Sequence, residues 1–208
     1  MIDTATQALS VALFDDGKLV ARHHAIVGRG HAEALLPAIA ALPEGGKADH
    51  IAVDVGPGSF TGVRIGLAAA RALAFAWHAS LSGYSAMTLV AAGAREHRKG
   101  ADDQAALAVA ITGGHGELFW QLFDADTLVE TAPLVSLPIP ILAQRAEQDN
   151  IYGSGADILV ASRGRGTAMT LYPDSRHYPL LPDTAMLAPR PLYGRGADAI
   201  PMASPAAA

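Results

Sequence analysis

The sequence predicts an α/β fold built on a mixed β-sheet. Two segments of alternating apolar residues, each interrupted by a Gly-containing turn, indicate β-hairpins at residues 8–27 and 105–126. Between them, short apolar strands alternate with helices. The chain has 208 residues, of which 50% are hydrophobic and 17% charged. It can therefore bury one large core or two smaller ones.

The first half of the chain reads as a hairpin followed by alternating helices and strands. The hairpin "ALSVALFDDGKLVARHHAIV" turns at Asp15-Asp16-Gly17, and only Met1-Ile2-Asp3-Thr4 and a three-residue linker precede it. We therefore expect either a short first strand or a native start upstream of Met1. "HAEALLPAIAALP" predicts a helix over 31–42 that Pro37 kinks. "HIAVDVGPG" predicts a strand that leads into a helix over 61–78. "SLSGYSAMTLVAAGARE" predicts a further strand and a third helix.

A polar, charged segment at 96–104 marks a domain boundary. It divides an N-terminal part, residues 1–100, from a smaller C-terminal part with a tail, residues 101–208. The second part opens with a hairpin that turns at 112–116. After it we predict helices near 138–149 and 183–188 and a strand at 150–152.

Composition restricts the function class. The net charge is −5, and the three lysines are Lys18, Lys47 and Lys99. A free-standing RNA-binding protein would carry a basic stripe with aromatic residues, so this class is disfavoured. The chain contains no cysteine. Arg64 and Arg71 interrupt apolar runs that are shorter than the roughly 20 residues a bilayer requires, and no secretory leader is evident. We therefore expect a cytoplasmic protein with no membrane association.

The loop Gly56-Pro57-Gly58-Ser59-Phe60-Thr61-Gly62 lies where phosphate-binding loops occur. It lacks the lysine of a Walker loop, and Thr61 replaces the third glycine of the dinucleotide-binding pattern. Ser59 or Thr61 could instead cap the following helix. A capped turn and an anion site both remain open at this point.

The helix over 61–78 is apolar around most of its circumference. Its polar residues Arg64, Arg71 and His78 recur every seven residues and form one narrow stripe. Such a helix must be covered on more than one side. Gly62 and Gly66 would permit another helix to approach closely. That helix could be the 31–42 helix of the same chain or a helix of a partner protein.

Four segments resemble the TsaB (YeaZ) family, in order and at family spacing: "IDTAT", "HAEALLP", "VGPGSFTGVRIGLAAARALA" and "PLYGRGADA". The resemblance implies a two-lobed actin/Hsp70-like ATPase (ASKHA) fold, with ribonuclease H-like mixed sheets and flanking helices. It also implies a role in forming threonylcarbamoyladenosine next to the anticodon of tRNAs that read codons beginning with A. TsaB members are non-catalytic partners of the transferase TsaD. We therefore expect a scaffold and activator of TsaD, not an enzyme.

The alternative is a catalytically active enzyme of this superfamily, either a TsaD-like transferase or a glycopeptidase-type metallopeptidase. TsaD-like chains resemble this one in the glycine loop but then carry a His-x-x-x-His metal pair on one helical face. Ser85 and Leu89 occupy those two positions here, so no metal site is expected. The adjacent His23 and His24 do not replace it, because neighbours on a strand point to opposite faces.

The second hairpin turn, "ITGGHGELFW", resembles the glycine-glycine-histidine phosphate loop of TsaD. It could equally be a turn in which glycine adopts positive φ, and the turn is the favoured interpretation. Across both loops, the residues that could bind phosphate are Gly58, Ser59, Thr61, Thr112, Gly113 and Gly114.

The helices over 31–42 and 61–78 are the predicted partner interface. The expected contacts are Leu35, Leu36, Ile39, Val63, Arg64, Leu67, Ala70, Arg71 and Ala74. The partners that the resemblance implies are TsaD and TsaE, with tRNA contacted indirectly through the complex. A homodimer is expected when TsaD is absent. The chain is expected to hold no cofactor of its own, although ATP or ADP could bind in the complex with TsaD and TsaE.

Overall fold

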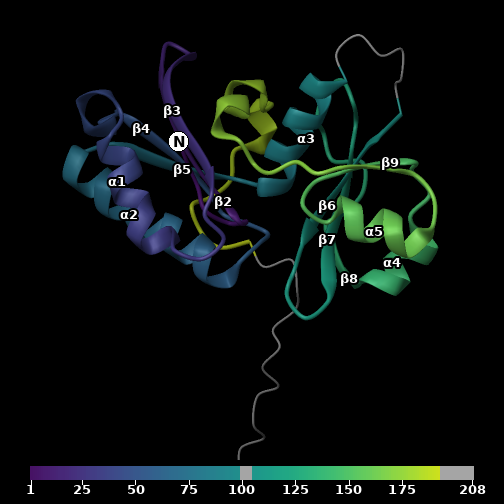
Figure 1. The fold of residues 1–208 in the computed structure, drawn as a ribbon. Helices are drawn as coiled ribbons and strands as arrows, with labels where there is room; N and C mark the ends of the chain where they lie inside the picture. Colours follow the sequence, from purple (N-terminus) through teal and green to yellow (C-terminus); the bar gives the residue numbers. More distant parts are fainter. Residues whose placement is uncertain (99–104, 193–208) are drawn as a thin grey trace, which may run out of the picture.

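The computed structural model describes residues 1–98 and 105–192, which form two lobes that each contain a five-stranded sheet (Figure 1). Along the chain the elements are β1 (Ile2–Asp3), β2 (Ala8–Asp15), β3 (Lys18–Ile26), α1 (His31–Ala40), η1 (Pro43–Gly46), β4 (His50–Asp54), α2 (Phe60–Trp77), β5 (Ser80–Tyr84), α3 (Ala86–His97), β6 (Leu107–Thr112), β7 (Glu117–Phe123), β8 (Val135–Pro138), α4 (Ile139–Arg145), β9 (Asn150–Tyr152), α5 (Ala156–Arg163), β10 (Thr167–Met169), η2 (Ser175–Leu180) and η3 (Asp183–Ala185).

The first sheet has the strand order β3-β2-β1-β4-β5 and is mixed. β1 runs antiparallel to β2 and parallel to β4, and β4 is parallel to β5. The helices α1 and α2 pack against each other and cover one face of this sheet (Figure 1). On the other face, η2 packs with α3 and contacts β2 and β3. The predicted α/β class and mixed sheet are confirmed.

The second sheet has the order β10-β9-β6-β7-β8. Alternate residues of β6 face opposite layers, as a strand buried on both sides requires. Leu107 and Val109 join the large core that includes α3, whereas Ala108 and Ala110 join a second core with α4 and α5. The helix α3 therefore lies against the inner face of this sheet and contacts β6, β7 and β9.

Most elements of the first half agree with the sequence. Asp16 and Gly17 form the first hairpin turn with φ values of 46° and 73°, the conformation that an Asp-Gly turn favours. The expected short first strand is confirmed as β1. In the second half of the chain, the predicted strand over 150–152 is confirmed as β9. The helix predicted over 138–149 is only the seven-residue α4, and 183–188 contains a single 3₁₀ turn, η3. The sequence did not predict β8, α5, β10 or η2.

The predicted domain boundary falls largely on residues 99–104, which lie outside the described part. The division it implied is wrong for one segment. Residues after about 174 return to the first lobe: Leu187 forms a bridge with Gly83, and the Leu192 N–H donates to the Val55 carbonyl at 2.7 Å. Most of the "PLYGRGADA" segment lies beyond Leu192, outside the described residues.

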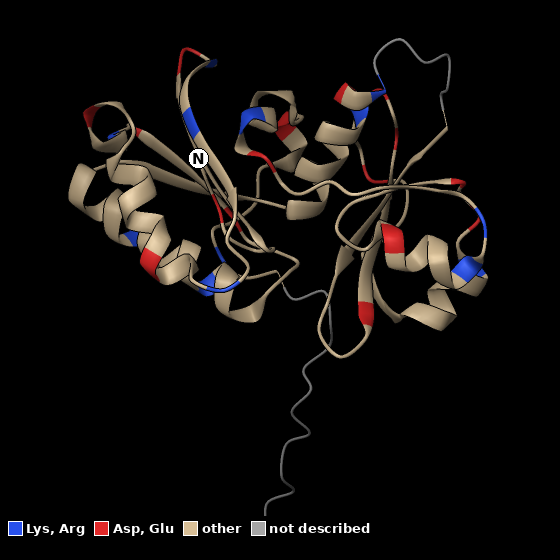
Figure 2. Cartoon of the chain, viewed as in Figure 1, with Lys and Arg blue, Asp and Glu red and all other residues tan. Residues whose placement is uncertain are grey.

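Charged residues are distributed over both lobes (Figure 2). Lysines and arginines of the described residues are scattered and do not follow one continuous stripe in this view. No helix within residues 1–98 and 105–192 is long and apolar enough to cross a membrane.

Candidate partner-binding surface

The glycine-rich loop between β4 and α2 packs against the turn that joins β1 to β2. A Cβ added at Gly58 would collide with the carbonyl oxygen of Ala5, and one at Gly62 would collide with that of Thr4. The Ser59 N–H donates to the Ala5 carbonyl at 2.6 Å, and the Thr4 hydroxyl donates to the Gly62 carbonyl at 2.8 Å. Glycine is needed here because two backbone segments approach closely.

The expectation that Gly62 and Gly66 admit a second helix is wrong. Both residues are buried, and a Cβ at Gly66 would lie 2.5 Å from the Thr4 hydroxyl oxygen. Gly62 and Gly66 therefore face β1, the middle strand of the sheet, and Thr4, which directly follows it. They set the distance between α2 and the sheet, and they are not accessible to a partner.

The same loop shows how the start of α2 is capped. The Ser59 side chain accepts the Gly62 N–H at 3.2 Å, so the capping prediction holds for Ser59, while Thr61 is exposed. The Val63 N–H donates to the Ser59 carbonyl at 2.9 Å. The N–H groups of Ser59, Gly62 and Val63 thus have partners inside the chain, and a phosphate at this loop would have to compete with them.

The second glycine turn closes the hairpin between β6 and β7. The Gly113 N–H donates to the Glu117 carbonyl at 2.9 Å. Thr112 pairs with Ser154: its N–H donates to the Ser154 hydroxyl at 3.1 Å, and its own hydroxyl donates to the Ser154 carbonyl at 3.2 Å. Gly114 is exposed. The donors considered for a phosphate are therefore engaged within the chain, those of Thr112 by Ser154 after β9 and that of Gly113 by the hairpin itself, in agreement with the turn interpretation.

Six of the nine predicted interface residues belong to the core. Their side chains are buried between the helices and the first sheet: Leu35, Ile39, Val63, Leu67, Ala70 and Ala74. The assignment of these six to a partner contact is wrong. The prediction chose the apolar side of each helix, and that side covers the sheet of the same chain.

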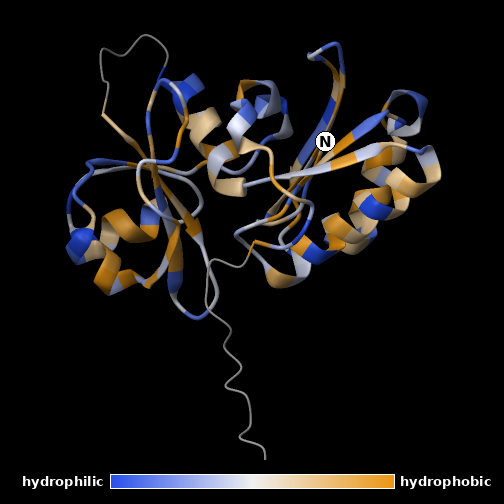
Figure 3. Ribbon diagram, turned by 180° about the vertical axis from the view of Figure 1, so that it is seen from behind, coloured by the Kyte–Doolittle hydropathy of each residue, from blue (hydrophilic) through white to orange (hydrophobic). Residues whose placement is uncertain are grey.

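The opposite side of the two helices is exposed. Leu36 of α1 and Phe75 of α2 have exposed fractions of 53% and 86%, and Ala68 and Ala72 are also exposed. We call these four residues the outer helical face. Figure 3 shows that hydrophobic and hydrophilic segments alternate along the two helices. Apolar side chains exposed on two helices that pack against each other are typical of a protein-binding surface.

The polar stripe of α2 could have located this face from the sequence. Arg64 and Arg71 are exposed and mark the side that faces away from the sheet, and Ala68 and Ala72 follow them at helical spacing. Arg64 stacks its guanidinium 3.2 Å above the centroid of the Phe60 ring. Arg71 donates to the Pro189 carbonyl at 2.8 Å and so attaches the returning C-terminal segment to α2.

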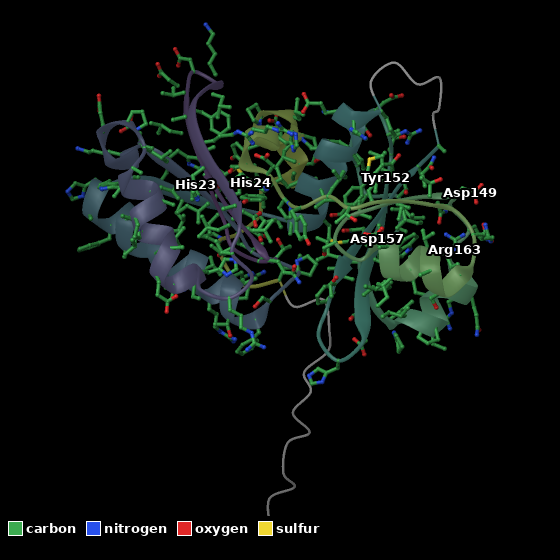
Figure 4. The ribbon with its side chains drawn as sticks, viewed as in Figure 1. His23, His24, Asp149, Tyr152, Asp157 and Arg163 are labelled. Carbon is green, nitrogen blue, oxygen red and sulfur yellow. The ribbon has the colours of Figure 1, made fainter. Side chains whose placement is uncertain are left out.

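The two positions aligned with the metal-binding histidines have structural roles. The Ser85 side chain caps α3 by accepting the Met87 N–H at 3.2 Å, and Leu89 is fully buried. His23 and His24 occupy neighbouring positions on β3 and lie on either side of it (Figure 4). Among the residues that the structure describes, no group of three or more His, Asp or Glu is arranged to hold a metal ion.

Sequence reasoning missed a buried acidic pair. Asp3 ends β1, Asp54 ends β4, and both are fully buried. The Tyr84 hydroxyl lies 3.0 Å from Asp3 Oδ2, and the Gly56 N–H donates to Asp54 Oδ1 at 2.8 Å. Burial raises the pKa of Asp54 to about 7 and raises the pKa of Asp3 well above its usual value, to which the charge of Asp54 adds.

Comparisons with known proteins agree with this architecture. A family model described as "TsaD: tRNA N6-adenosine threonylcarbamoyltransferase" matches residues 21–132, more than half of the chain. The tRNA threonylcarbamoyladenosine biosynthesis protein TsaB of Escherichia coli K12 is 38% identical over 130 residues, which cover 60% of this chain and 54% of that protein. YeaZ from Pseudomonas aeruginosa superposes with a TM-score of 0.74 at 27% identity, over 92% of this chain and 97% of that one. The chain belongs to the TsaB (YeaZ) family.

The family assignment is supported by a second TsaB protein, from Bacillus subtilis 168, which is 32% identical over 101 residues covering 45% of this chain and 43% of that protein. The match spans about half the length of these curated TsaB relatives. The TsaD family model places this TsaB chain in the wider TsaD-like group, and its two mixed sheets with flanking helices form the ASKHA-type fold that the resemblance implied.

Proposed function

We propose that this chain is a scaffold and activator of the TsaD threonylcarbamoyl transferase, in the formation of threonylcarbamoyladenosine next to the anticodon of tRNAs that read codons beginning with A. The names of its TsaB relatives support the pathway. The observation that carries the scaffold role is the outer helical face, where Leu36, Ala68, Ala72 and Phe75 expose apolar surface on two adjacent helices.

The alternative, an active TsaD-like transferase or glycopeptidase-type metallopeptidase, has less support. Ser85 is committed to capping α3, and Leu89 offers no ligand atom and is packed in the core. A metal held at these positions would need other side chains and a different helix start.

The proposed partners follow from the same surface. TsaD would bind at the outer helical face, and a second copy of this chain would occupy that face when TsaD is absent, because two-fold symmetry allows one patch to cover its own copy. TsaE and tRNA would join through the complex, with ATP or ADP bound there and not by this chain alone. The net charge of −5 and the scattered basic residues support indirect contact with tRNA (Figure 2). We place this activity in the cytoplasm.

A transfer assay with purified proteins tests the proposal. TsaD from the same organism should co-purify with this chain and should modify tRNA faster in its presence. The chain alone should neither modify tRNA nor hydrolyse ATP. Metal-dependent turnover that follows the isolated chain through a final sizing column would contradict the scaffold role and favour the enzyme alternative.

A further inference from the structure

Charged residues are few on the two helices that carry the outer helical face (Figure 2). α1 contains Glu33, and α2 contains Arg64 and Arg71 and no acidic residue. All three are exposed. Arg64 precedes Ala68 by four residues and Arg71 precedes Phe75 by four, so each arginine lies one helical turn from a member of the outer helical face. The apolar residues of α2 are therefore accompanied by positive charge alone.

Neighbouring groups of the chain orient both arginines. The Arg64 guanidinium lies 3.2 Å from the centroid of the Phe60 ring, and Arg71 Nη2 donates to the Pro189 carbonyl at 2.8 Å. A ring face and a carbonyl orient a guanidinium but leave its charge in place. An oriented guanidinium loses less entropy when it binds a carboxylate, which its planar donors fit in a bidentate manner. Both arginines are therefore suited to receive carboxylates from a partner.

This charge affects the two occupants of the outer helical face in opposite ways. In a two-fold dimer the same patch meets itself, so Arg64 and Arg71 of one copy would approach those of the other. On these two helices, Glu33 of each copy is the acidic residue that could offset them. Like charges that are brought together in a contact oppose binding, whereas a partner that presents carboxylates is attracted by the same arginines.

We propose that Arg64 and Arg71 select TsaD over a second copy of this chain, and that the TsaD surface bound at the outer helical face presents carboxylates to them. This inference rests on the proposed function, because it takes TsaD as the partner. The apolar side chains bind either occupant, and the arginines decide between the two. Salt screens an attraction in one complex and a repulsion in the other. Rising salt should therefore weaken TsaD binding and strengthen self-association.

Titration calorimetry with TsaD and light scattering of the chain alone test this inference, at about 0.05 M and about 0.3 M NaCl, between which the Debye length shortens about twofold. At the lower salt, Arg64→Gln should bind TsaD about threefold more weakly than the wild type, as expected for the loss of one exposed ion pair, and should self-associate more tightly. Arg64→Lys keeps the charge and should keep the salt dependence of both complexes. Arg145→Gln removes an exposed arginine of α4 in the second lobe and should change neither complex.

Equal affinities of the wild type and Arg64→Gln for TsaD would overturn the inference. So would self-association of Arg64→Gln that is no tighter than that of the wild type, because the arginine would then not oppose the homodimer. If Phe75→Glu loses TsaD while Arg64→Gln binds it normally, the proposed interface stands and the selection by charge alone fails. If the wild type does not bind TsaD at all, the proposed function fails and this inference fails with it.

Discussion

Asp3 and Asp54 lie beside each other at the ends of the parallel strands β1 and β4, and each has one buried carboxyl oxygen without a hydrogen-bond partner, Oδ1 of Asp3 and Oδ2 of Asp54. A proton held between the two groups would give both oxygens a partner. Burial raises the pKa of both carboxyl groups, and the charge of Asp54 raises the pKa of Asp3 further.

This pair predicts a pH dependence of stability. The pKa of Asp54 is about 7 in the folded chain and lies near its ordinary value of 3.8 when unfolded. The folded state therefore retains a proton that the unfolded state loses, and this stabilisation is full below about pH 4 and is lost as pH rises through about 7. In Asp54→Asn, the free energy of unfolding should fall less between pH 5 and 7 than in the wild type, by up to about 1.4 kcal/mol per pH unit.

Urea unfolding at pH 5, 6 and 7 measures this difference. Asparagine keeps an oxygen for the Gly56 N–H, so the variant is expected to fold. The Met1 amine has a lowered pKa, so its burial reduces the free energy of unfolding as pH falls from 8 towards 5, which is opposite to the effect of Asp54. This effect of Met1 is the same in both proteins. Parallel pH profiles for the two proteins would show that Asp54 does not retain the proton.

The close packing of the glycine loop predicts unequal costs for two glycine substitutions. Gly62→Ala would place a methyl group against the Thr4 carbonyl oxygen and should destabilise the chain by about 1 to 3 kcal/mol. Gly114→Ala has open space around its Cβ and should change stability by less than about 0.5 kcal/mol. Chemical denaturation of both variants measures the costs. Similar values would indicate that the contact with Thr4 relaxes freely.

The two sides of α2 predict a second contrast. Ala70→Glu puts a carboxylate into the core, where Ala70 is fully buried, and should lower the Tm by at least about 6 °C. Ala68→Glu lies on the exposed side of the same helix and should change the free energy of unfolding by less than about 0.5 kcal/mol. Circular dichroism melts distinguish them. A stable Ala70→Glu variant would contradict the burial of that face.

Self-association should depend on the exposed side of α2. The chain without TsaD should form a two-fold dimer at tens of micromolar, since the outer helical face of one copy can cover that of a second copy. Ala72→Glu should give a monomer without a lower Tm, because Ala72 is exposed in the single chain. Light scattering coupled to size exclusion reports the mass. A wild-type monomer, or a dimer that persists in Ala72→Glu, would show that this face does not mediate self-association.

The sequence predicted local structure well where chemistry acts over a few residues. The Asp16-Gly17 turn and the Ser59 cap follow from short-range geometry, and both are present. From the sequence, the faces of α1 and α2 were assigned wrongly. An apolar helix face can be covered either by the sheet of its own chain or by a partner protein. Composition alone does not distinguish them, and the six core residues, Ala70 among them, were assigned to the wrong one.

Contacts between segments that are distant along the chain could not be predicted from the sequence. The pairing of Leu187 with Gly83 joins segments more than 100 residues apart, so the return of the C-terminal segment to the first lobe had no local signal. The Asp3–Asp54 pair likewise depends on β1 and β4 being neighbours in the sheet. β10 has three residues and α5 has eight, too few for periodicity to identify them.

The affinity of TsaD for the Phe75→Glu variant decides whether the outer helical face binds the transferase. Phe75 is 86% exposed on the outer helical face, and Ile158, 48% exposed on α5 of the second lobe, provides the matched control Ile158→Glu. Titration calorimetry should show at least about a tenfold loss of affinity for Phe75→Glu, as expected for an aromatic anchor, while Ile158→Glu binds as the wild type does. Wild-type affinity in Phe75→Glu would contradict the proposed interface.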